Sequence, residues 1–286
     1  MTTYKISSED SGARLDLFLV DKLPHLSRAH IQKLNSHGKL TVSGVKVKDG
    51  YILKNSDLIN VDLLQEPSRP KANVKINVLY EDSDSVVFEK PNGMLTHSKG
   101  AFNPEETVET WLVDRLQGIS GPRAGIVHRL DRGTSGVMIC AKNAESLKWL
   151  QKQFSQRKVK KTYLAIIDGH MKHHEAIIDM PIERNPKAPA TFRVGANGKS
   201  AQTHYRVLKQ NEKYSLLELS PVTGRTHQLR VHLSKQNHPI IGDIFYGGSK
   251  AERLLLHAKS LEITLPNRER KIFESKPPKI FEDYIK

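Results

Sequence analysis

The stretch GIVHRLDRGTSGVMICAKN, residues 125–143, carries the most structural information in this sequence. A short apolar run ends in the polar string His-Arg-Leu-Asp, a Gly-Thr-Ser-Gly turn follows, and a buried strand is predicted from Val137. Asp131 is therefore held between two apolar strands beside a glycine-rich turn. A carboxylate in such a place can be partly dehydrated yet open to a substrate, and such groups serve as nucleophiles or bases. The alternative for a lone aspartate is a turn cap.

Two later segments weaken that alternative. SPVTGRTHQLRVHL, residues 220–233, places a dense polar array directly after a predicted strand, where burial without a purpose is costly. Arg225 can form a bidentate ion pair with a carboxylate and keep it charged. A phosphate clamp is the other interpretation, and Arg230 fits the clamp better than Arg225 does. In KVKKTYLAIIDG, residues 158–169, Tyr163 shares a strand face with Ala165 and can stack on an extruded base or relay a proton.

The composition indicates a polyanionic partner. The 286 residues contain 45 Lys and Arg against 31 Asp and Glu, a net charge of +14. Such an excess favours nucleic acid, because cations that neutralise phosphates release bound counterions. The first twenty residues lack a signal-peptide pattern, and no apolar run is long enough to span a bilayer. A single cysteine, Cys140, excludes an internal disulfide and fits a reducing compartment. We therefore expect a cytoplasmic protein without membrane association.

Residues 1–64 form a predicted small α/β domain. Helices are expected over residues 14–23 and from a Ser27 cap to Ser36, followed by two strands around Ser43-Gly44 and a last strand near residues 57–61. Basic side chains lie between these elements. The candidates for contact with an RNA backbone are Arg14, Arg28, Lys33, Lys39 and Lys46. The alternative is a cationic helix–hairpin domain that binds something else or packs on its neighbour.

A proline-containing stretch of low apolar content, residues 65–73, predicts a linker, and residues 74–286 a second domain. In the second domain Asn103-Pro104 predicts a helix start, and another helix is expected from Asn143. Strands dominate and few follow a strand–helix–strand rhythm. We therefore expect an α+β fold with a mixed, mainly antiparallel sheet.

Five segments together resemble the RluA-type RNA pseudouridine synthase family. They are HRLDRGTSG (128–136), KTYLA (161–165), GRTHQLRVHL (224–233), HPIIGDIFYGG (238–248) and LLLHA (254–258), in the family's order. The first 64 residues resemble the ribosomal-protein-S-four-type RNA-binding domain, although Ser56-Asp57 stands where a Gly-Asp is usual. Gly133 stands where many members of that synthase family carry an acidic residue, in the turn after Asp131.

The resemblance implies specific roles. Asp131 is the carboxylate required for base transfer, Tyr163 contacts the uracil and helps remove its proton, and Arg225 is the ion-pair partner of Asp131. Leu229 lines the base, and Arg129 fills the space that the flipped nucleotide leaves. His128 and Lys161, in the same motifs, are further candidates for substrate contact.

The reaction implied is an isomerisation of uridine to pseudouridine, in which nothing is oxidised, reduced or lost. We therefore expect no cofactor and no metal. Asp131 can attack the ribose or the ring, or remove a sugar proton, and the sequence leaves these routes open. His170, His173 and His174 could suggest a metal site, but they lie in a hydrophilic loop without a matching ligand cluster, so a metal site is disfavoured.

The resemblance implies RNA as the partner, with ribosomal RNA favoured, transfer RNA as the second possibility, and no obligate protein partner. A non-catalytic RNA-binding or ribosome-assembly factor is the alternative function, and it fits the first 65 residues and the charge equally well. The presence of Asp131, Tyr163 and Arg225 argues against it. An RNA methyltransferase is disfavoured because no strand leads into a G-x-G-x-G turn.

Overall fold

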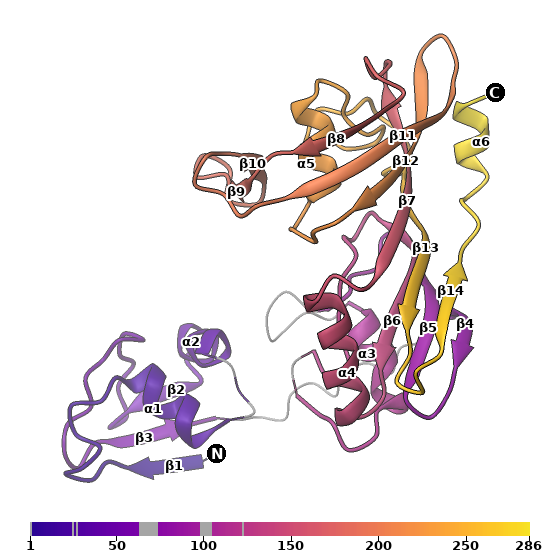
Figure 1. Cartoon of the computed structure of the whole chain (residues 1–286). Helices are drawn as coiled ribbons and strands as arrows, with labels where there is room; N and C mark the ends of the chain where they lie inside the picture. The colour runs from indigo at the N-terminus through magenta and orange to yellow at the C-terminus, as the bar shows by residue number, and fades with distance from the viewer. Residues whose placement is uncertain (1, 25, 27, 63–73, 98–104, 122) are drawn as a thin grey trace. The chain divides into compact units, whose positions relative to one another are not determined.

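The computed structural model of the chain describes most of its residues (Figure 1), namely 2–24, 26, 28–62, 74–97, 105–121 and 123–286. These residues divide into two compact units. The N-terminal unit holds residues 1–72 with 97–106, and the C-terminal unit holds residues 73–96 with 107–286. The predicted linker at 65–73 and the predicted cap Ser27 lie outside the described residues.

The N-terminal unit is a small sheet covered by two helices. Its elements are β1 (Thr2–Lys5), α1 (Leu15–Lys22), α2 (Arg28–Ser36), β2 (Leu40–Val42) and β3 (Leu58–Val61). The described strands pair antiparallel in the order β1-β3-β2. Leu15, Leu19 and Ile31 are buried against the sheet, as the helical spacing predicts.

The predicted hairpin around Ser43-Gly44 is only partly correct. Both residues have positive φ, 48° and 80°, which gives the tight turn. The chain after the turn makes a single bridge at Val45 and does not continue as a strand, so β2 pairs with β3 instead. Beyond this bridge the backbone oxygen of Val47 accepts a hydrogen bond from the Asn35 side chain at 2.8 Å.

A long mixed sheet forms the C-terminal unit. Its described strands run in the order β4-β5-β6-β13-β7-β12-β11-β8, with β14 beside β13. Every pairing is antiparallel except that of β6 with β13, so the predicted α+β fold is confirmed. The strands are β4 (Asn77–Glu81), β5 (Ser85–Lys90), β6 (Ser135–Ala141), β7 (Lys160–Asp168), β8 (Glu175–Asp179), β11 (Gln202–Gln210), β12 (Tyr214–Pro221), β13 (Leu256–Thr264) and β14 (Arg270–Glu274).

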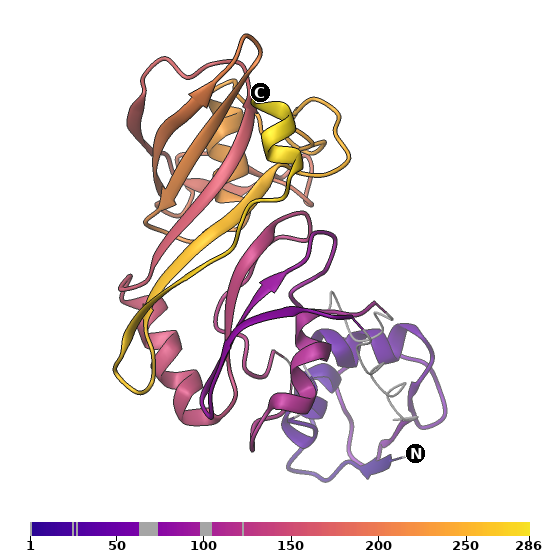
Figure 2. The same cartoon turned by 90° about the vertical axis from the view of Figure 1, so that its right-hand side faces the viewer.

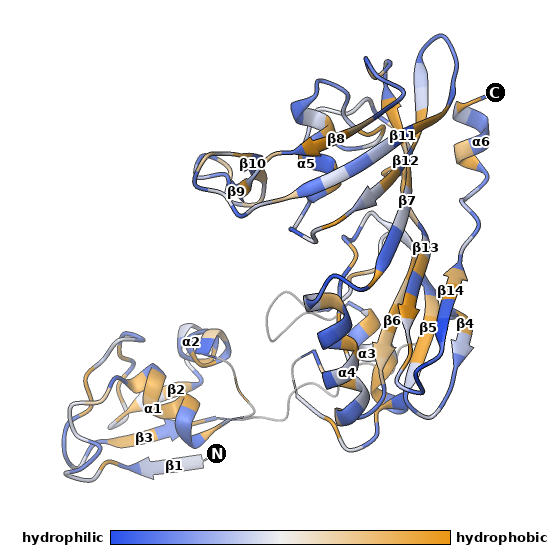
Figure 3. Ribbon diagram, viewed as in Figure 1, coloured by the Kyte–Doolittle hydropathy of each residue, from blue (hydrophilic) through white to orange (hydrophobic). Residues whose placement is uncertain are grey.

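The long strands β7 and β13 lie side by side and connect the part of the sheet around β5 and β6 with the part around β11 and β12 (Figures 1 and 2). Apolar residues concentrate along β5, β6 and β13 (Figure 3). A separate hairpin consists of β9 (Ile182–Arg184) and β10 (Phe192–Val194). The helices are α3 (Val108–Leu112), the 3-10 helix η1 (Val113–Arg115), α4 (Ala144–Ser155), α5 (Gln228–Lys235) and α6 (Ile280–Tyr284).

The start of β6 depends on a glycine. Gly136 has a φ of 114°, and a Cβ there would lie 2.2 Å from the backbone oxygen of Ala258. The absence of a side chain lets β13 approach β6 closely, in the parallel pairing of Ala258 with Gly136. Every residue of β6 is buried. The turn that carries Asp131 therefore leads into a rigid central strand.

Two helix starts illustrate capping. The side chain of Asn143 accepts a hydrogen bond from the backbone N–H of Ser146, so α4 begins as predicted. Asn103-Pro104 lies outside the described residues, and the described helix begins only after Thr107, which forms a capping box with Thr110. The prediction of a helix running from residue 103 is wrong, because residues 105 and 106 are not helical.

Candidate active site

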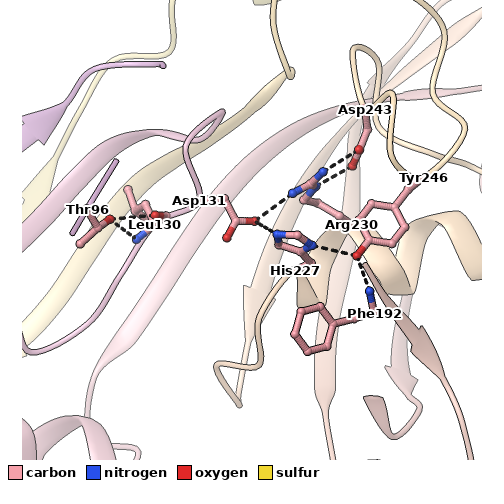
Figure 4. A network of polar contacts seen from close by, with 8 residues as sticks. All are labelled: Thr96, Leu130, Asp131, Phe192, His227, Arg230, Asp243 and Tyr246. Carbon is pink, nitrogen blue, oxygen red and sulfur yellow. Dashed lines mark hydrogen bonds and ion pairs between the residues drawn. The ribbon is translucent and has the colours of Figure 1, made fainter. Parts of the chain in front are cut away.

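Asp131 lies in the loop that leads into β6, and neighbouring segments hold this loop at several backbone atoms. The hydroxyl of Thr96 donates to the oxygen of Leu130 at 2.8 Å and accepts from its N–H at 3.3 Å (Figure 4). The backbone N–H of Gly93 donates to the oxygen of Arg132 at 2.9 Å. The carboxylate of Asp131 is 17% exposed, so it is partly dehydrated but open to the pocket.

Lys90 lies beneath this loop and is 1% exposed. Its ammonium donates to the backbone oxygens of Pro91 and Met94, both at 2.8 Å, and of Arg132 at 3.3 Å. Burial lowers the pKa of Lys90 to about 7, although the negative charge of Asp131 acts in the opposite direction. Lys90 thus ties the end of β5 to the loop that carries Asp131.

The cation that pairs with Asp131 is Arg230, in the first turn of α5. Its Nη1 donates to the Asp131 carboxylate at 3.3 Å. Its Nε and Nη2 form a bidentate pair with Asp243 at 2.7 and 2.8 Å. Because the Asp243 side chain is fully buried and Arg230 is 8% exposed, this pair fixes the guanidinium and leaves one nitrogen for Asp131.

The predicted ion pair of Arg225 with Asp131 is wrong. The Nε of Arg225 donates to the backbone oxygen of Ser200 at 3.0 Å, and its backbone N–H donates to the side chain of Gln228. Arg225 precedes the left-handed residue His227, after which α5 starts. The helix then carries Arg230 back towards Asp131. Arg225 still lines the pocket.

His227 also faces Asp131. Its Nε2 lies 3.8 Å from the carboxylate, and its Nδ1 lies 2.8 Å from the hydroxyl of Tyr246. The same hydroxyl accepts the backbone N–H of Phe192, in β10, at 2.9 Å. Figure 4 shows this network joining Asp131 to α5, to the segment around Asp243 and to the β9–β10 hairpin.

The pocket beside Asp131 combines charged and apolar groups. Tyr163 of β7 is half-buried, and burial together with the charge of Asp131 raises the pKa of its phenol, so the phenol stays protonated. Burial lowers the pKa of Lys161 to about 8. The lining residues are Arg129, Leu130, Asp131, Thr134, Lys161, Tyr163, Pro221, Thr223, Gly224, Arg225, Thr226, His227, Gln228, Leu229, Arg230 and Leu256.

The other predicted substrate contacts divide into two groups. Arg129, Lys161 and Leu229 all line the pocket. His128 does not. Its Nε2 accepts the backbone N–H of Ile139 at 3.1 Å and its ring stacks on Phe154, so His128 contacts the fold in this structure, and its contact with substrate stays a prediction. Burial lowers the pKa of His128 to about 3, which keeps the imidazole neutral as this acceptor role requires.

Four of the basic residues predicted to contact RNA have partners within the N-terminal unit, namely Arg14, Arg28, Lys39 and Lys46. The buried carboxylate of Asp16 pairs with Arg14 and Arg28, whose side chains remain 43% and 50% exposed. Lys39 pairs with Asp62 at 3.1 Å. The ammonium of the exposed residue Lys46 donates to the backbone oxygen of Ser36. Lys33, the fifth predicted RNA contact, lies on α2 and is half-buried.

Among the described residues, no three His, Cys, Asp or Glu side chains gather in a group that can hold a metal ion. None of the helices in the described ranges combines the length and apolar character needed to cross a membrane.

Three site residues escaped the sequence prediction: Arg230 as the ion-pair partner, Asp243 as its anchor, and Tyr246 as the partner of His227. Asp243 and Tyr246 belong to HPIIGDIFYGG, a segment that matches the family without suggesting a role. An aspartate in a glycine-rich turn carries little local signal. A buried guanidinium, however, requires a buried carboxylate, and this requirement is the signal that indicates an acidic partner for Arg230.

The chain is similar to known proteins over most of its length. A family model described as RNA pseudouridylate synthase matches residues 84–235, and an S4 domain model matches residues 13–59. The ribosomal large subunit pseudouridine synthase D of Borreliella burgdorferi is 38% identical over 295 residues, covering 96% of this chain and 89% of that protein. Its counterpart in Xanthomonas campestris is 33% identical, covering 93% and 86%. The structure of human RNA pseudouridylate synthase domain containing 1 aligns with a TM-score of 0.61 at 29% identity, covering 73% of this chain and 86% of that one.

Proposed function

This chain belongs to the RNA pseudouridylate synthase family, and from this membership we propose that it isomerises uridine in large-subunit ribosomal RNA with Asp131 as the catalytic carboxylate. One observation carries the proposal. The Asp131 carboxylate lies in a pocket lined by Tyr163 and Leu229, and the Arg230 guanidinium, itself anchored by buried Asp243, holds it in place.

The chemistry requires the bond between the ribose and N1 of uracil to break and a bond from the same ribose carbon to C5 to form. The hydrogen on C5 leaves, and N1 ends with a hydrogen, so the product is an isomer. An ionised carboxylate can attack the ribose or the ring, or take a proton from the sugar. Arg230 serves each route in the same way, because it holds the charged carboxylate in one orientation.

The target uridine has to leave its stack to reach this pocket. Extruding a base costs a few kcal/mol, which stacking on a side chain helps to offset. The ring of Tyr163 and the apolar side chains of Leu229 and Leu256 supply such a surface. Arg129 is exposed at the pocket and suits the space that the extruded nucleotide leaves. Because the phenol of Tyr163 stays protonated, it acts as a hydrogen-bond donor before it can accept a proton.

Ribosomal RNA is the proposed substrate because the relatives from Borreliella burgdorferi and Xanthomonas campestris are named for the large ribosomal subunit. Residues 1–64 are proposed to hold the RNA and residues 74–286 to carry out the reaction, in the cytoplasm. Arg14 and Arg28 suit the first role, since each keeps about half of its side chain exposed while Asp16 orients it.

The direct test uses a large-subunit ribosomal RNA transcript with tritium at C5 of uridine. The wild-type protein is expected to release tritium as pseudouridine forms, and Asp131→Asn is expected to release none while retaining RNA affinity, which phosphate contacts dominate. Asp114→Asn, at an exposed site on η1, is the matched control and should behave like wild type. Tritium release by Asp131→Asn at the wild-type rate would refute the assignment.

A further inference from the structure

His227 is clamped between the β9–β10 hairpin and the loop after Asp243. Its ring makes edge-on contacts with Phe192 of β10 and with Tyr246, each at 5.6 Å between ring centres. Its backbone is left-handed, with a φ of 56°, which is uncommon for a residue other than glycine. The side chain is 18% exposed. His227 is thus held in one orientation, with Nε2 towards Asp131 and Nδ1 towards Tyr246 (Figure 4).

The hydrogen bonds around His227 favour one of the two ring nitrogens as the carrier of the proton. The Tyr246 hydroxyl accepts the backbone N–H of Phe192 at 2.9 Å, and its own hydrogen is free to point at Nδ1 of His227, 2.8 Å away. A neutral imidazole that accepts at Nδ1 carries its hydrogen on Nε2. The reverse tautomer would direct the Nε2 lone pair at the Asp131 carboxylate, which is electrostatically unfavourable.

We propose that Tyr246 and His227 are positioning residues for the reaction. Tyr246 fixes the tautomer of His227 that directs an N–H at Asp131, and the β9–β10 hairpin holds Tyr246 in place through the hydrogen bond from Phe192. This inference rests on the proposed function. At 3.8 Å this N–H lies beyond hydrogen-bond distance, so it acts on the carboxylate through its dipole, beside the direct donor Arg230, and favours one orientation of Asp131.

The charges around His227 agree with a neutral ring. Burial lowers the pKa of His227, and the nearby cations Arg230 and Arg129 lower it further, while Asp131 and Asp243 act in the opposite direction. A neutral ring has one N–H, so the tautomer decides what Asp131 meets. Tyr246 can set that choice because its own pKa is raised, mainly by burial, which keeps the hydroxyl hydrogen in place.

The hairpin is the element that connects RNA contact to this arrangement. Phe192 and Val194 of β10 pack on a small core with Ile182 and Val231, and Tyr246 packs against the same core. Charged residues project from the hairpin and the segment that follows it, namely Arg184, Lys187, Arg193 and Lys199. RNA bound to these cations would act on β10, and a shift of Phe192 would break the hydrogen bond to Tyr246.

The first experiment measures kcat and KM on the ribosomal RNA transcript. Tyr246→Phe is expected to lower kcat about fivefold, the rate equivalent of one neutral hydrogen bond, with KM unchanged. Tyr205→Phe is the matched control, since its hydroxyl donates to the backbone oxygen of His173 away from the pocket, and it should keep wild-type kcat. Equal kcat values for the two variants would overturn the inference.

Substitutions of His227 test the tautomer. The amide nitrogen of glutamine reaches the position of Nε2 and that of asparagine the position of Nδ1, so His227→Gln should retain more activity than His227→Asn. The nitrogen NMR spectrum of histidine-labelled protein, assigned by the signals that His227→Gln removes, should show a protonated Nε2 and a bare Nδ1. The opposite pattern, or an asparagine variant more active than the glutamine variant, would overturn the inference.

A third experiment tests the link between the β9–β10 hairpin and Tyr246 by comparing Phe192→Pro with Phe192→Ala. Proline removes the N–H as well as the ring, whereas alanine removes the ring alone, and this N–H donates to Tyr246 rather than to β9. Phe192→Pro should therefore lower kcat below Phe192→Ala in wild type but not in Tyr246→Phe. An equal difference in both backgrounds would refute the link. Absence of pseudouridine formation by wild type would instead refute the proposed function, so the two failures are distinguishable.

Discussion

Replacing Arg230 with glutamine tests the geometry of the site most sharply. The guanidinium joins the fully buried carboxylate of Asp243 to the carboxylate of Asp131. Arg230→Gln leaves Asp243 as a buried charge without a cation, and breaking such a pair costs about 3–5 kcal/mol of folding stability. Loss of one hydrogen bond to a charged group costs about 1.5–3 kcal/mol, so kcat should fall about 10- to 150-fold if that bond orients the reacting carboxylate.

A second variant separates folding from catalysis. Combining Arg230→Gln with Asp243→Asn removes both buried charges, so much of the lost stability should return, as measured by urea unfolding. The tritium-release rate should stay low, because Asp131 still lacks its guanidinium. Arg225→Gln should lose less than about fivefold in rate, since it gives up one hydrogen bond to the Ser200 backbone. An Arg225→Gln variant more impaired than Arg230→Gln would refute the reasoning.

Three further predictions concern other residues. The pKa of Lys90 falls from 10.5 to about 7 on folding, so between these pH values the unfolded chain binds more protons than the folded chain. The free energy of unfolding should therefore rise with pH in this range, by up to about 1.4 kcal/mol per pH unit. Urea unfolding of Lys90→Met should lack this rise, and a rise that persists in the variant would show that another group causes it. Tyr163→Phe should keep the KM for RNA, whereas Tyr163→Ala should lose stacking worth about 1–3 kcal/mol, and equal KM values for the two variants would exclude stacking. Lys46→Gln should weaken RNA binding, and if Lys46 contacts one phosphate, the slope of log affinity against log salt concentration should become shallower by about 0.7–0.9. An unchanged slope would show that Lys46 does not contact the RNA.

The sequence was a good guide where a feature depends on neighbours along the chain. The cap at Asn143, the buried strand after the Gly-Thr-Ser-Gly turn and the position of Tyr163 on its strand follow from local spacing, and the structure has each of them. The matched segments also bring Asp131 and Tyr163 to one pocket. Local pattern was sufficient here because periodicity and caps act over a few residues.

The choice between Arg225 and Arg230 could not be made in this way. Both flank the start of α5, and the left-handed residue His227, which determines where the helix begins, has no sequence signature. The anchor Asp243 lies 13 residues further on, in a turn whose fold depends on long-range contacts. The failed prediction of the second hairpin strand also involves a contact between distant residues, because the Asn35 side chain on α2 donates to the backbone oxygen of Val47.

The measurement that tests the central claim most directly is a map of pseudouridines in large-subunit ribosomal RNA from three cell lines. The lines lack the protein, carry the wild-type chain, or carry Asp131→Asn at the same level. We expect at least one position to be pseudouridine with the wild-type chain and uridine in the other two. The same pseudouridines in all three lines, or their restoration by Asp131→Asn, would contradict catalysis by Asp131 on this RNA.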